Sequence, residues 1–357
     1  MSFEITSELL ANITSSIEVS NDKAIVALFE EMHYADIAEI LDELSFDNVV
    51  YIIKLLDSEK TSAVLMELDE GIREKTLQNL SAKEIAEEVE ELDSDDAADI
   101  IGELSQERQE AVLSKIEDEE HVKEIEELLA YDEDSAGGLM AKELVKVNEN
   151  WTVLKCVREM RTQAEEVTRV HSIYVVDDND KLKGRLSLKD LLITSTKTAI
   201  SEVYIPKVDF VNVHDDLDEV SNKMRKYDLE AIPVVDNDGI LLGRITIDDI
   251  VDVIKEEADK DYQLAAGLTQ DVEADDSILQ LTKARLPWLF LGLLGGVGAF
   301  LIMVMFENTF DENAVLFFFT PLIAAMAGNV GVQSSAIIVQ GLANDDVKGS
   351  INIRLVK

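Results

Sequence analysis

Carboxylates at helical spacing are the clearest candidates for chemistry in this chain. In LDSDDAADIIGEL, Asp95 and Asp99 stand four residues apart and so share one helix face. Like charges placed this way repel unless a cation neutralises them, and carboxylate oxygens are ligands of hard cations. Acids are also favoured at a helix N-terminus by capping and by the helix dipole. A cation site and a purely structural helix start therefore both stay open.

A second acidic stripe lies in GRITIDDIVDVIKEEADKDYQ, where Asp249, Asp252 and Glu256 follow the i, i+3, i+7 spacing of one helix face. Such a stripe favours a divalent cation shared with another acidic surface. Three earlier acids are candidates for that surface: Asp216, Asp218 and Asp228. Lys255 and Lys260 interrupt the run, which leaves an exposed charged helix as the alternative.

Polar side chains also occur inside the uncharged segment 314–344, which contains AAMAGNVGVQSSAIIVQGLA. In hydrocarbon, polar groups such as Asn329 and Gln333 are expected to face other helices or water. Gly328 and Gly331 flank Asn329 and allow close approach of another helix. Amide oxygens also coordinate a cation or its hydration waters. The pattern indicates either an ion path or a helix-packing face.

The charge balance favours a protein that attracts cations over one that binds nucleic acid. The net charge is −42 over 357 residues, and residues 1–130 carry 36 Asp and Glu but 9 Lys and Arg. So acidic a surface repels nucleic acid and attracts cations. The single cysteine, Cys156, excludes a disulfide framework, and the N-terminus shows no signal peptide. The four His are scattered, and no His-carboxylate cluster, nucleophile motif or phosphate loop indicates an enzyme.

A 12-residue repeat organises the acidic region. Leu followed by Ser or Asp recurs six times between Leu44 and Ser105, with an apolar residue three positions before each Leu. Leu113 with Ile116 extends the series. Ser and Asp are good N-caps, and the apolar pair makes one helix face, so each unit predicts a short helix and a tight turn. Short helices are marginal alone, which predicts a stacked all-α superhelix over 1–130.

Two related segments follow the small-residue joint YDEDSAGGLM. IYVVDDNDKLKGRLSLKDLL begins at Ile173, and IPVVDNDGILLGRITIDDIV begins at Ile232, 59 residues later. Each predicts strand, acidic turn, strand and helix. The duplicated Gly-x-x-[Ser/Thr]-x-x-Asp resembles a tandem pair of CBS modules. That resemblance implies an adenine-nucleotide site involving Ser187, Asp190, Thr246 and Asp249. The alternative is that each hydroxyl and Asp only cap the helix.

Two segments are expected to cross a membrane, at about 286–306 and 316–342, because the uncharged runs 286–306 and 314–344 are long enough for a bilayer. The connecting loop ENTFDEN is acidic, whereas Lys283 and Arg285 precede the first run and Lys348 follows the second. The positive-inside tendency therefore places the loop outside and both ends in the cytoplasm.

Taken together, the acidic repeats, the YDEDSAGGLM joint, the paired modules, RLPWL and AGNVGVQ resemble the MgtE family of magnesium transporters and channels. The resemblance implies a multidomain protein: an α-superhelical sensor at 1–130, CBS domains at 131–255, a connecting plug helix at 256–284 and a transmembrane region at 285–357. It also implies a multi-pass homodimer of the plasma membrane with cytoplasmic N-terminal domains. The chain ends at Lys357. We therefore expect three further family helices to lie outside it, and this chain alone not to conduct.

The family also implies the roles of particular residues. Mg²⁺ would bind the cytoplasmic acids and close the pore, and ATP or another adenine nucleotide would bind the CBS pair. The implied sensor acids are Asp95, Asp99, Asp216, Asp218, Asp228, Asp249, Asp252 and Glu257, and the implied pore residues are Gly328, Asn329, Gly331 and Gln333. Selectivity among Mg²⁺, Mn²⁺ and Co²⁺ stays open. The competing interpretation is a membrane-tethered nucleotide sensor with an acidic protein-docking domain.

Overall fold

The computed structural model describes residues 5–164, 167, 169–268, 272, 277–307 and 314–343. The acidic loop at 308–313, the end after residue 343 and the side chain of Glu256 lie outside the described residues. The chain falls into two compact units, Met1–Ile250 and Val251–Lys357.

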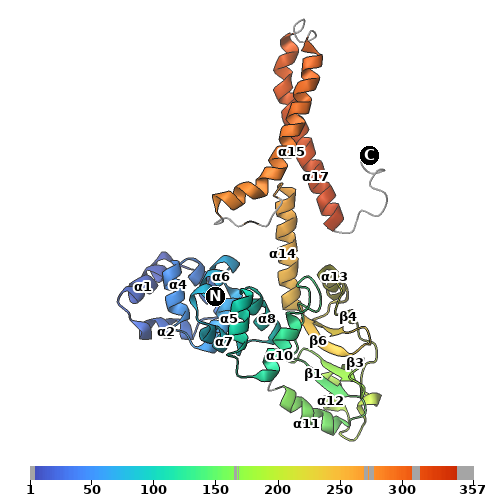
Figure 1. The fold of residues 1–357 in the computed structure, drawn as a ribbon. Coiled ribbons are helices and arrows are strands. Elements are labelled where there is room, and N and C mark those ends of the chain that lie inside the picture. Colours follow the sequence, from blue (N-terminus) through green and yellow to red (C-terminus); the bar gives the residue numbers. More distant parts are fainter. Residues whose placement is uncertain are drawn as a thin grey trace. The chain divides into compact units, whose positions relative to one another are not determined.

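Short helices make up the N-terminal part of the first unit (Figure 1). They are α1 (Ser7–Glu18), α2 (Asp22–Glu30), α3 (Tyr34–Asp42), α4 (Phe46–Ile53), α5 (Ser58–Glu67), α6 (Glu70–Asn79), α7 (Ala82–Val89), α8 (Ser94–Gly102), α9 (Gln106–Leu113) and α10 (Glu119–Leu128). Many of these helices pack against the helix two places later in the chain: α3 against α5, α5 against α7, α7 against α9, α4 against α6 and α8 against α10. This alternation is how short helices bury a continuous core.

The 12-residue repeat is confirmed residue by residue. Its Ser and Asp positions are the N-caps of six consecutive helices, α4 to α9. Ser81 makes a full capping box with Glu84. The apolar position three residues before each repeat Leu is buried throughout: Leu41, Ile53, Leu65, Leu77, Val89 and Ile101. The repeat therefore sets both the start of each helix and the face that enters the core.

Two small α+β modules complete the first unit, and each holds a three-stranded sheet. The first contains β1 (Val145–Asn148), α11 (Val153–Gln163), β2 (Ile173–Val176), β3 (Leu182–Leu186) and α12 (Leu188–Ile193). A 3-10 turn, η1 (Ile200–Glu202), precedes the second, which contains β4 (Val211–Asn212), α13 (Leu217–Tyr227), β5 (Ala231–Val235), β6 (Leu241–Thr246) and the start of α14 (Ile247–Ala265).

The two modules repeat the same topology, as their sequences predict. β1 pairs with β2 in parallel and β2 with β3 antiparallel, and β4, β5 and β6 do the same. The turns correspond too: Asp180 and Gly239, 59 residues apart, both have positive φ. In each turn an Asp, Asp177 or Asp236, accepts two backbone N–H bonds that close it. The local sequence thus determines the hairpin of each module.

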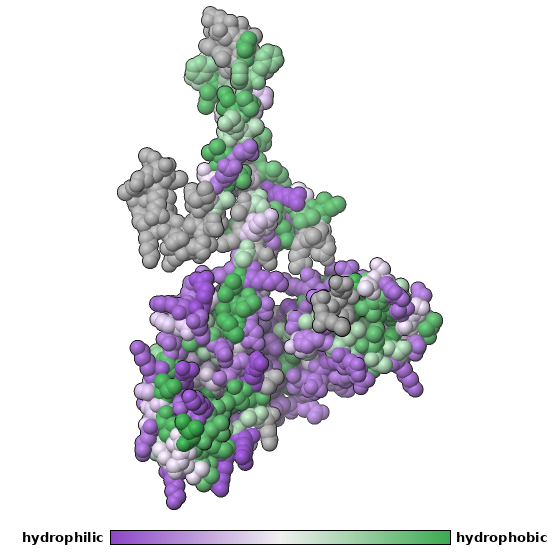
Figure 2. Space-filling view, turned by 180° about the vertical axis from the view of Figure 1, so that it is seen from behind, coloured by the Kyte–Doolittle hydropathy of each residue, from purple (hydrophilic) through white to green (hydrophobic). Residues whose placement is uncertain are grey.

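The second unit is helical. It contains most of α14, then α15 (Ile278–Met305), a 3-10 segment η2 (Ala314–Phe319) and α17 (Thr320–Ala343). Within the described part of the chain, one helix, α15, is long and apolar enough to cross a membrane by length and composition. Figure 2 shows hydrophobic side chains concentrated over the α15 and α17 helices, with hydrophilic side chains prominent elsewhere.

α15 begins eight residues before the expected start of the first span at Leu286. The reason is local: Ser277 and Gln280 form a capping box that starts the helix at Ile278. The expected second span coincides with η2 and α17, which are helical, and its role as a span stays a prediction.

Candidate functional site

The acids of α8 are placed by the start of the helix. Asp93 is its N-cap, Asp95 and Asp96 lie in its first turn, and Asp99 follows one turn after Asp95. The side chain of Asp93 makes no capping hydrogen bond to the backbone of α8. The helix dipole favours these acids, but it does not require four of them within seven residues.

Two other segments of the first unit reach α8. Glu143 accepts a hydrogen bond from the Ser94 backbone N–H at 3.0 Å and another from the Ser94 hydroxyl at 3.0 Å. Arg244, on β6, is 6% exposed; its Nε donates to the Glu143 carbonyl and its Nη2 lies 3.4 Å from Asp93 Oδ2. The helical region is therefore attached to the second module through the N-terminus of α8.

Asp249 approaches the same acids from the first turns of α14. Its Oδ2 accepts hydrogen bonds from the Thr246 hydroxyl at 2.6 Å and the Thr246 N–H at 3.0 Å. The bond from the Thr246 N–H is the Asp half of the capping arrangement that the sequence left open, whereas the Thr246 hydroxyl donates to Asp249. The Asp249 charge also acts on Asp95, Asp96 and Asp99, whose pKa values it raises. The structure thus brings together the predicted residues Asp95, Asp99 and Asp249.

Burial and the charges of neighbouring groups raise the pKa values of Asp95, Asp96, Asp99 and Asp249. For Asp95 burial is the main cause, followed by the charges of Asp96, Asp249 and Glu143. Burial likewise raises the pKa of Asp96 to about 7. Asp99 keeps an exposed surface, yet desolvation raises its pKa to about 7 against the opposing effect of Arg73. Burial also raises the pKa of Asp249, although its bonds from Thr246 oppose the shift.

A divalent cation is the ligand that this donor set fits. One carboxylate oxygen from each of Asp93, Asp95 and Glu143 lies within 4.8 Å of the others. All are hard oxygen donors, as Mg²⁺ and Ca²⁺ prefer, and a cation would offset the repulsion that raises the pKa values. We call the set Asp93, Asp95, Asp96, Asp99, Glu143 and Asp249 the α8 acid cluster.

Sequence reasoning missed half of this cluster. The 12-residue repeat predicts Asp93 only as an N-cap, although its place among four acids within seven residues is a usable signal. Asp96 stands in the same run. Glu143 lies 49 residues after Ser94, and no spacing in the sequence indicates their contact.

The other predicted sensor acids lie elsewhere. Asp216 caps α13 and Asp228 follows its last residue, so the 11-residue helix separates them by about 16 Å. Asp216, Asp218 and Asp228 are all exposed. Asp252 and Glu257 are on the part of α14 that belongs to the second unit. Their sensor roles stay predictions.

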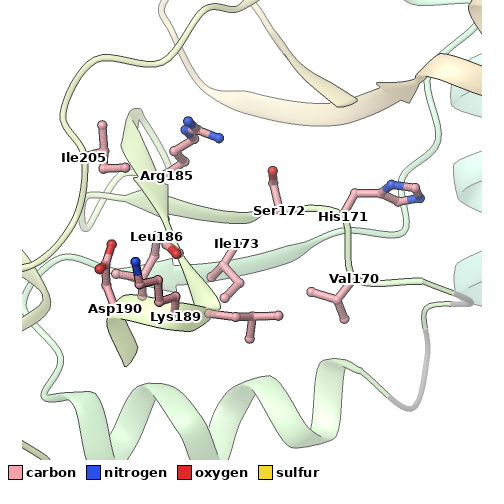
Figure 3. Close-up of a pocket in the computed structure, with 11 residues that line it drawn as sticks. Val170, His171, Ser172, Ile173, Arg185, Leu186, Lys189, Asp190 and Ile205 are labelled. Carbon is pink, nitrogen blue, oxygen red and sulfur yellow. The ribbon is translucent and has the colours of Figure 1, made fainter. Parts of the chain in front are cut away.

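A pocket of about 490 Å³ opens on the first module around Ser187 and Asp190 (Figure 3). Arg185, Lys189 and His171 also line it, and sequence reasoning did not select these three. Ser187 makes no capping hydrogen bond to α12, so its hydroxyl is not tied to the helix start. Basic and hydroxyl groups beside a carboxylate suit a phosphorylated ligand with a hydroxyl-bearing sugar.

One further cluster includes a histidine, although the four His are scattered in the sequence. His121 and Glu124, both on α10, come together with Glu143, with one donor atom from each within 4.8 Å of the others. The i, i+3 spacing on α10 was visible in the sequence, but the contact with Glu143 was not.

The predicted pore residues lie on α17. Asn329 and Gln333 are four residues apart and therefore on one helix face, and both are exposed in this chain. A Cβ added at Gly328 or Gly331 would meet no atom within 4 Å. Their role in an ion path stays a prediction.

Comparison with known proteins identifies both parts of the first unit. A model of the MgtE intracellular N domain matches residues 32–134, and a model of the CBS domain matches 136–195 and 200–256. The magnesium transporter MgtE of Thermus thermophilus is 38% identical over 219 residues, 61% of this chain and 49% of the relative. That of Enterococcus faecalis is 37% identical over 228 residues, 64% of this chain and 50% of the relative.

A solved structure agrees with these relatives. The cytosolic domain of the Mg²⁺ channel MgtE, crystallised in complex with ATP, is 34% identical and superposes with a TM-score of 0.64, covering 69% of this chain and 100% of that chain. This chain spans about half the length of the curated relatives it matches. With its N-terminal domain, its CBS pair and its relatives all in agreement, the chain belongs to the MgtE family.

Proposed function

We propose that this chain senses cytoplasmic Mg²⁺ for a Mg²⁺ transport protein of the plasma membrane and supplies its first membrane helices. The observation that carries the proposal is the α8 acid cluster, in which burial and repulsion between carboxylates raise the pKa values of Asp95, Asp96, Asp99 and Asp249. Its named relatives are magnesium transporters. The proposal includes a multi-pass homodimer with cytoplasmic N-terminal domains, and transport rather than catalysis.

The mechanism follows from the same charges. Without a divalent cation, the acids of α8 repel Asp249 and Glu143, and the helical region separates more easily from the second module. A bound cation offsets that repulsion and stabilises the attached form. The ion shifts this equilibrium only by its difference in affinity for the two forms, so a tenfold difference contributes about 1.4 kcal/mol. In the full protein, contact between the helical region and the second module would favour the closed pore through α14, which begins in that module.

Removing charge from the cluster tests the sensor. Asp95→Asn combined with Asp99→Asn should remove the ability of Mg²⁺ to protect the joint at 131–140 from proteolysis. The attached form itself should become more stable in chelator, because two repelling charges are gone. The matched control is Asp47→Asn with Glu107→Gln, which removes two exposed first-turn acids from α4 and α9. Equal Mg²⁺ protection in the double variant and in the control would refute the proposal.

A second function, adenine-nucleotide binding, is favoured by the pocket at Ser187 and Asp190. The related cytosolic domain was crystallised in complex with ATP. Asp190→Ala should weaken ATP binding measured by calorimetry by about tenfold or more, since a charged hydrogen bond contributes about 1.5–3 kcal/mol. Asp178→Ala, at an exposed hairpin turn, is the control. ATP binding that is unchanged in Asp190→Ala would exclude this pocket.

A further inference from the structure

A cluster with a histidine lies beside the α8 acid cluster and differs from it in donor type. It consists of His121, Glu124 and Glu143, whose donor atoms lie within 4.8 Å of one another. The residues come from two segments, α10 and the start of the first module. Each is partly buried, so the three side chains are partly shielded from water.

The histidine is already oriented by a neighbour. Its Nε2 lies 3.3 Å from the Val89 carbonyl oxygen, which can only accept a hydrogen bond. A neutral ring therefore carries its proton on Nε2 and keeps one nitrogen lone pair. Metal-binding histidines commonly have this kind of outer contact, with a carbonyl that fixes the tautomer and the ring orientation.

The carboxylates are also held in place. Both Glu143 oxygens accept hydrogen bonds from Ser94, which limits the rotation of that side chain. Burial raises the pKa of Glu124, and the Glu143 charge adds to the shift, although the positive charges of His121 and Lys142 oppose it. The Lys142 ammonium also forms an ion pair with Glu127, at 2.9 Å. Two carboxylates and an imidazole therefore converge on one point.

We propose that His121, Glu124 and Glu143 bind a transition-metal ion of the Mn²⁺, Co²⁺ or Zn²⁺ class at a site distinct from the oxygen-only α8 acid cluster. Imidazole nitrogen suits these ions, whereas Mg²⁺ prefers oxygen and keeps several waters. Because Glu143 belongs to both groups, the two sites share a ligand. A transition metal here would act on the same contact between the helical region and the second module.

Cobalt absorption in the visible range tests the site in the full chain, kept in detergent at a fixed Mg²⁺ concentration. Co²⁺ should produce a saturable band in the parent protein. His121→Ala and Glu124→Gln should each weaken Co²⁺ binding by about tenfold or more. Loss of a residue that only orients a metal ligand already costs about tenfold in affinity, and loss of the ligand itself should cost at least as much. Two control variants should bind Co²⁺ as the parent does. They are His33→Ala, at the exposed N-cap of α3, and Glu126→Gln, at an exposed acid on α10.

Glu124→Gln decides the test because it preserves shape and leaves the Val89 contact intact. Co²⁺ affinity in Glu124→Gln equal to that of the parent would overturn the proposal. An equal loss in Glu126→Gln would also overturn it. The same variant should keep Mg²⁺ protection of the joint at 131–140, so a failure of this site and a failure of the Mg²⁺ sensor give different results.

Discussion

The two CBS modules carry the same motif 59 residues apart, yet its side chains have different surroundings. In the first module, Arg185 is exposed and lines the pocket with Ser187 and Asp190. In the second, the equivalent Arg244 is buried and contacts Asp93 and Glu143. One copy therefore offers a ligand pocket, whereas the other joins the module to the helical region.

The hydroxyl and acid of the motif differ in the same way. Thr246 donates its hydroxyl hydrogen bond to Asp249, which faces the charges of α8. Ser187 makes no capping bond, and both it and Asp190 line the pocket. Both copies keep the preceding glycine, because a Cβ at Gly184 would collide with the Ile205 carbonyl and one at Gly243 with the Ala141 carbonyl. The backbone is conserved between the copies while the role of the side chains is not.

The largest expected difference is between the two arginines. Arg244→Gln removes the buried charge that contacts the Glu143 carbonyl and Asp93, and breaking a buried charged contact costs about 3–5 kcal/mol. Arg185→Gln should change stability by about 0.5 kcal/mol or less, because its side chain is exposed. Thermal unfolding followed by circular dichroism in chelator measures both. Similar losses of stability in the two variants would mean that Arg244 is not the attachment point.

An intermediate effect is expected from pH, and only at the contact between α8 and the second module. The folded-state pKa values of Asp96 and Asp99 are raised from 3.8 to about 7, so attachment is most stable below pH 4 for these groups and weakens as pH rises toward 7. Mg²⁺ should reverse that loss at pH 8 and have little effect at pH 5, where protons already neutralise the acids.

The rate of proteolysis at the joint 131–140, measured from pH 5 to 8 with and without Mg²⁺, gives the pH profile of attachment. Asp96→Asn should flatten it, whereas Asp238→Asn, in the exposed turn between β5 and β6, should not. An identical pH profile in Asp96→Asn and in the parent would contradict the assignment.

The sequence predicted the elements better than it predicted the site, and the reason is the range of the interactions. The 12-residue repeat determines helix starts because capping acts within three residues, as at Ser81 and Glu84. The module hairpins are equally local. The pairing of Ser94 with Glu143, and of Asp93 with Arg244, joins residues 49 and 151 positions apart. No local rule indicates which copy of a duplicated arginine turns toward α8.

The smallest expected effect compares the two hydroxyls. Thr246→Val keeps the shape of the side chain but removes the 2.6 Å hydrogen bond to Asp249, which should cost about 1 kcal/mol of stability. That bond lowers the pKa of Asp249, so its loss should also raise this pKa further and weaken Mg²⁺ binding at neutral pH. Ser187→Ala removes no capping bond, so stability should change by about 0.5 kcal/mol or less while ATP binding weakens. Measuring unfolding, Mg²⁺ midpoint and ATP affinity in both variants separates the roles. If Ser187→Ala shifted the Mg²⁺ midpoint as much as Thr246→Val, the two copies would share one function, and the division between pocket and attachment would be wrong.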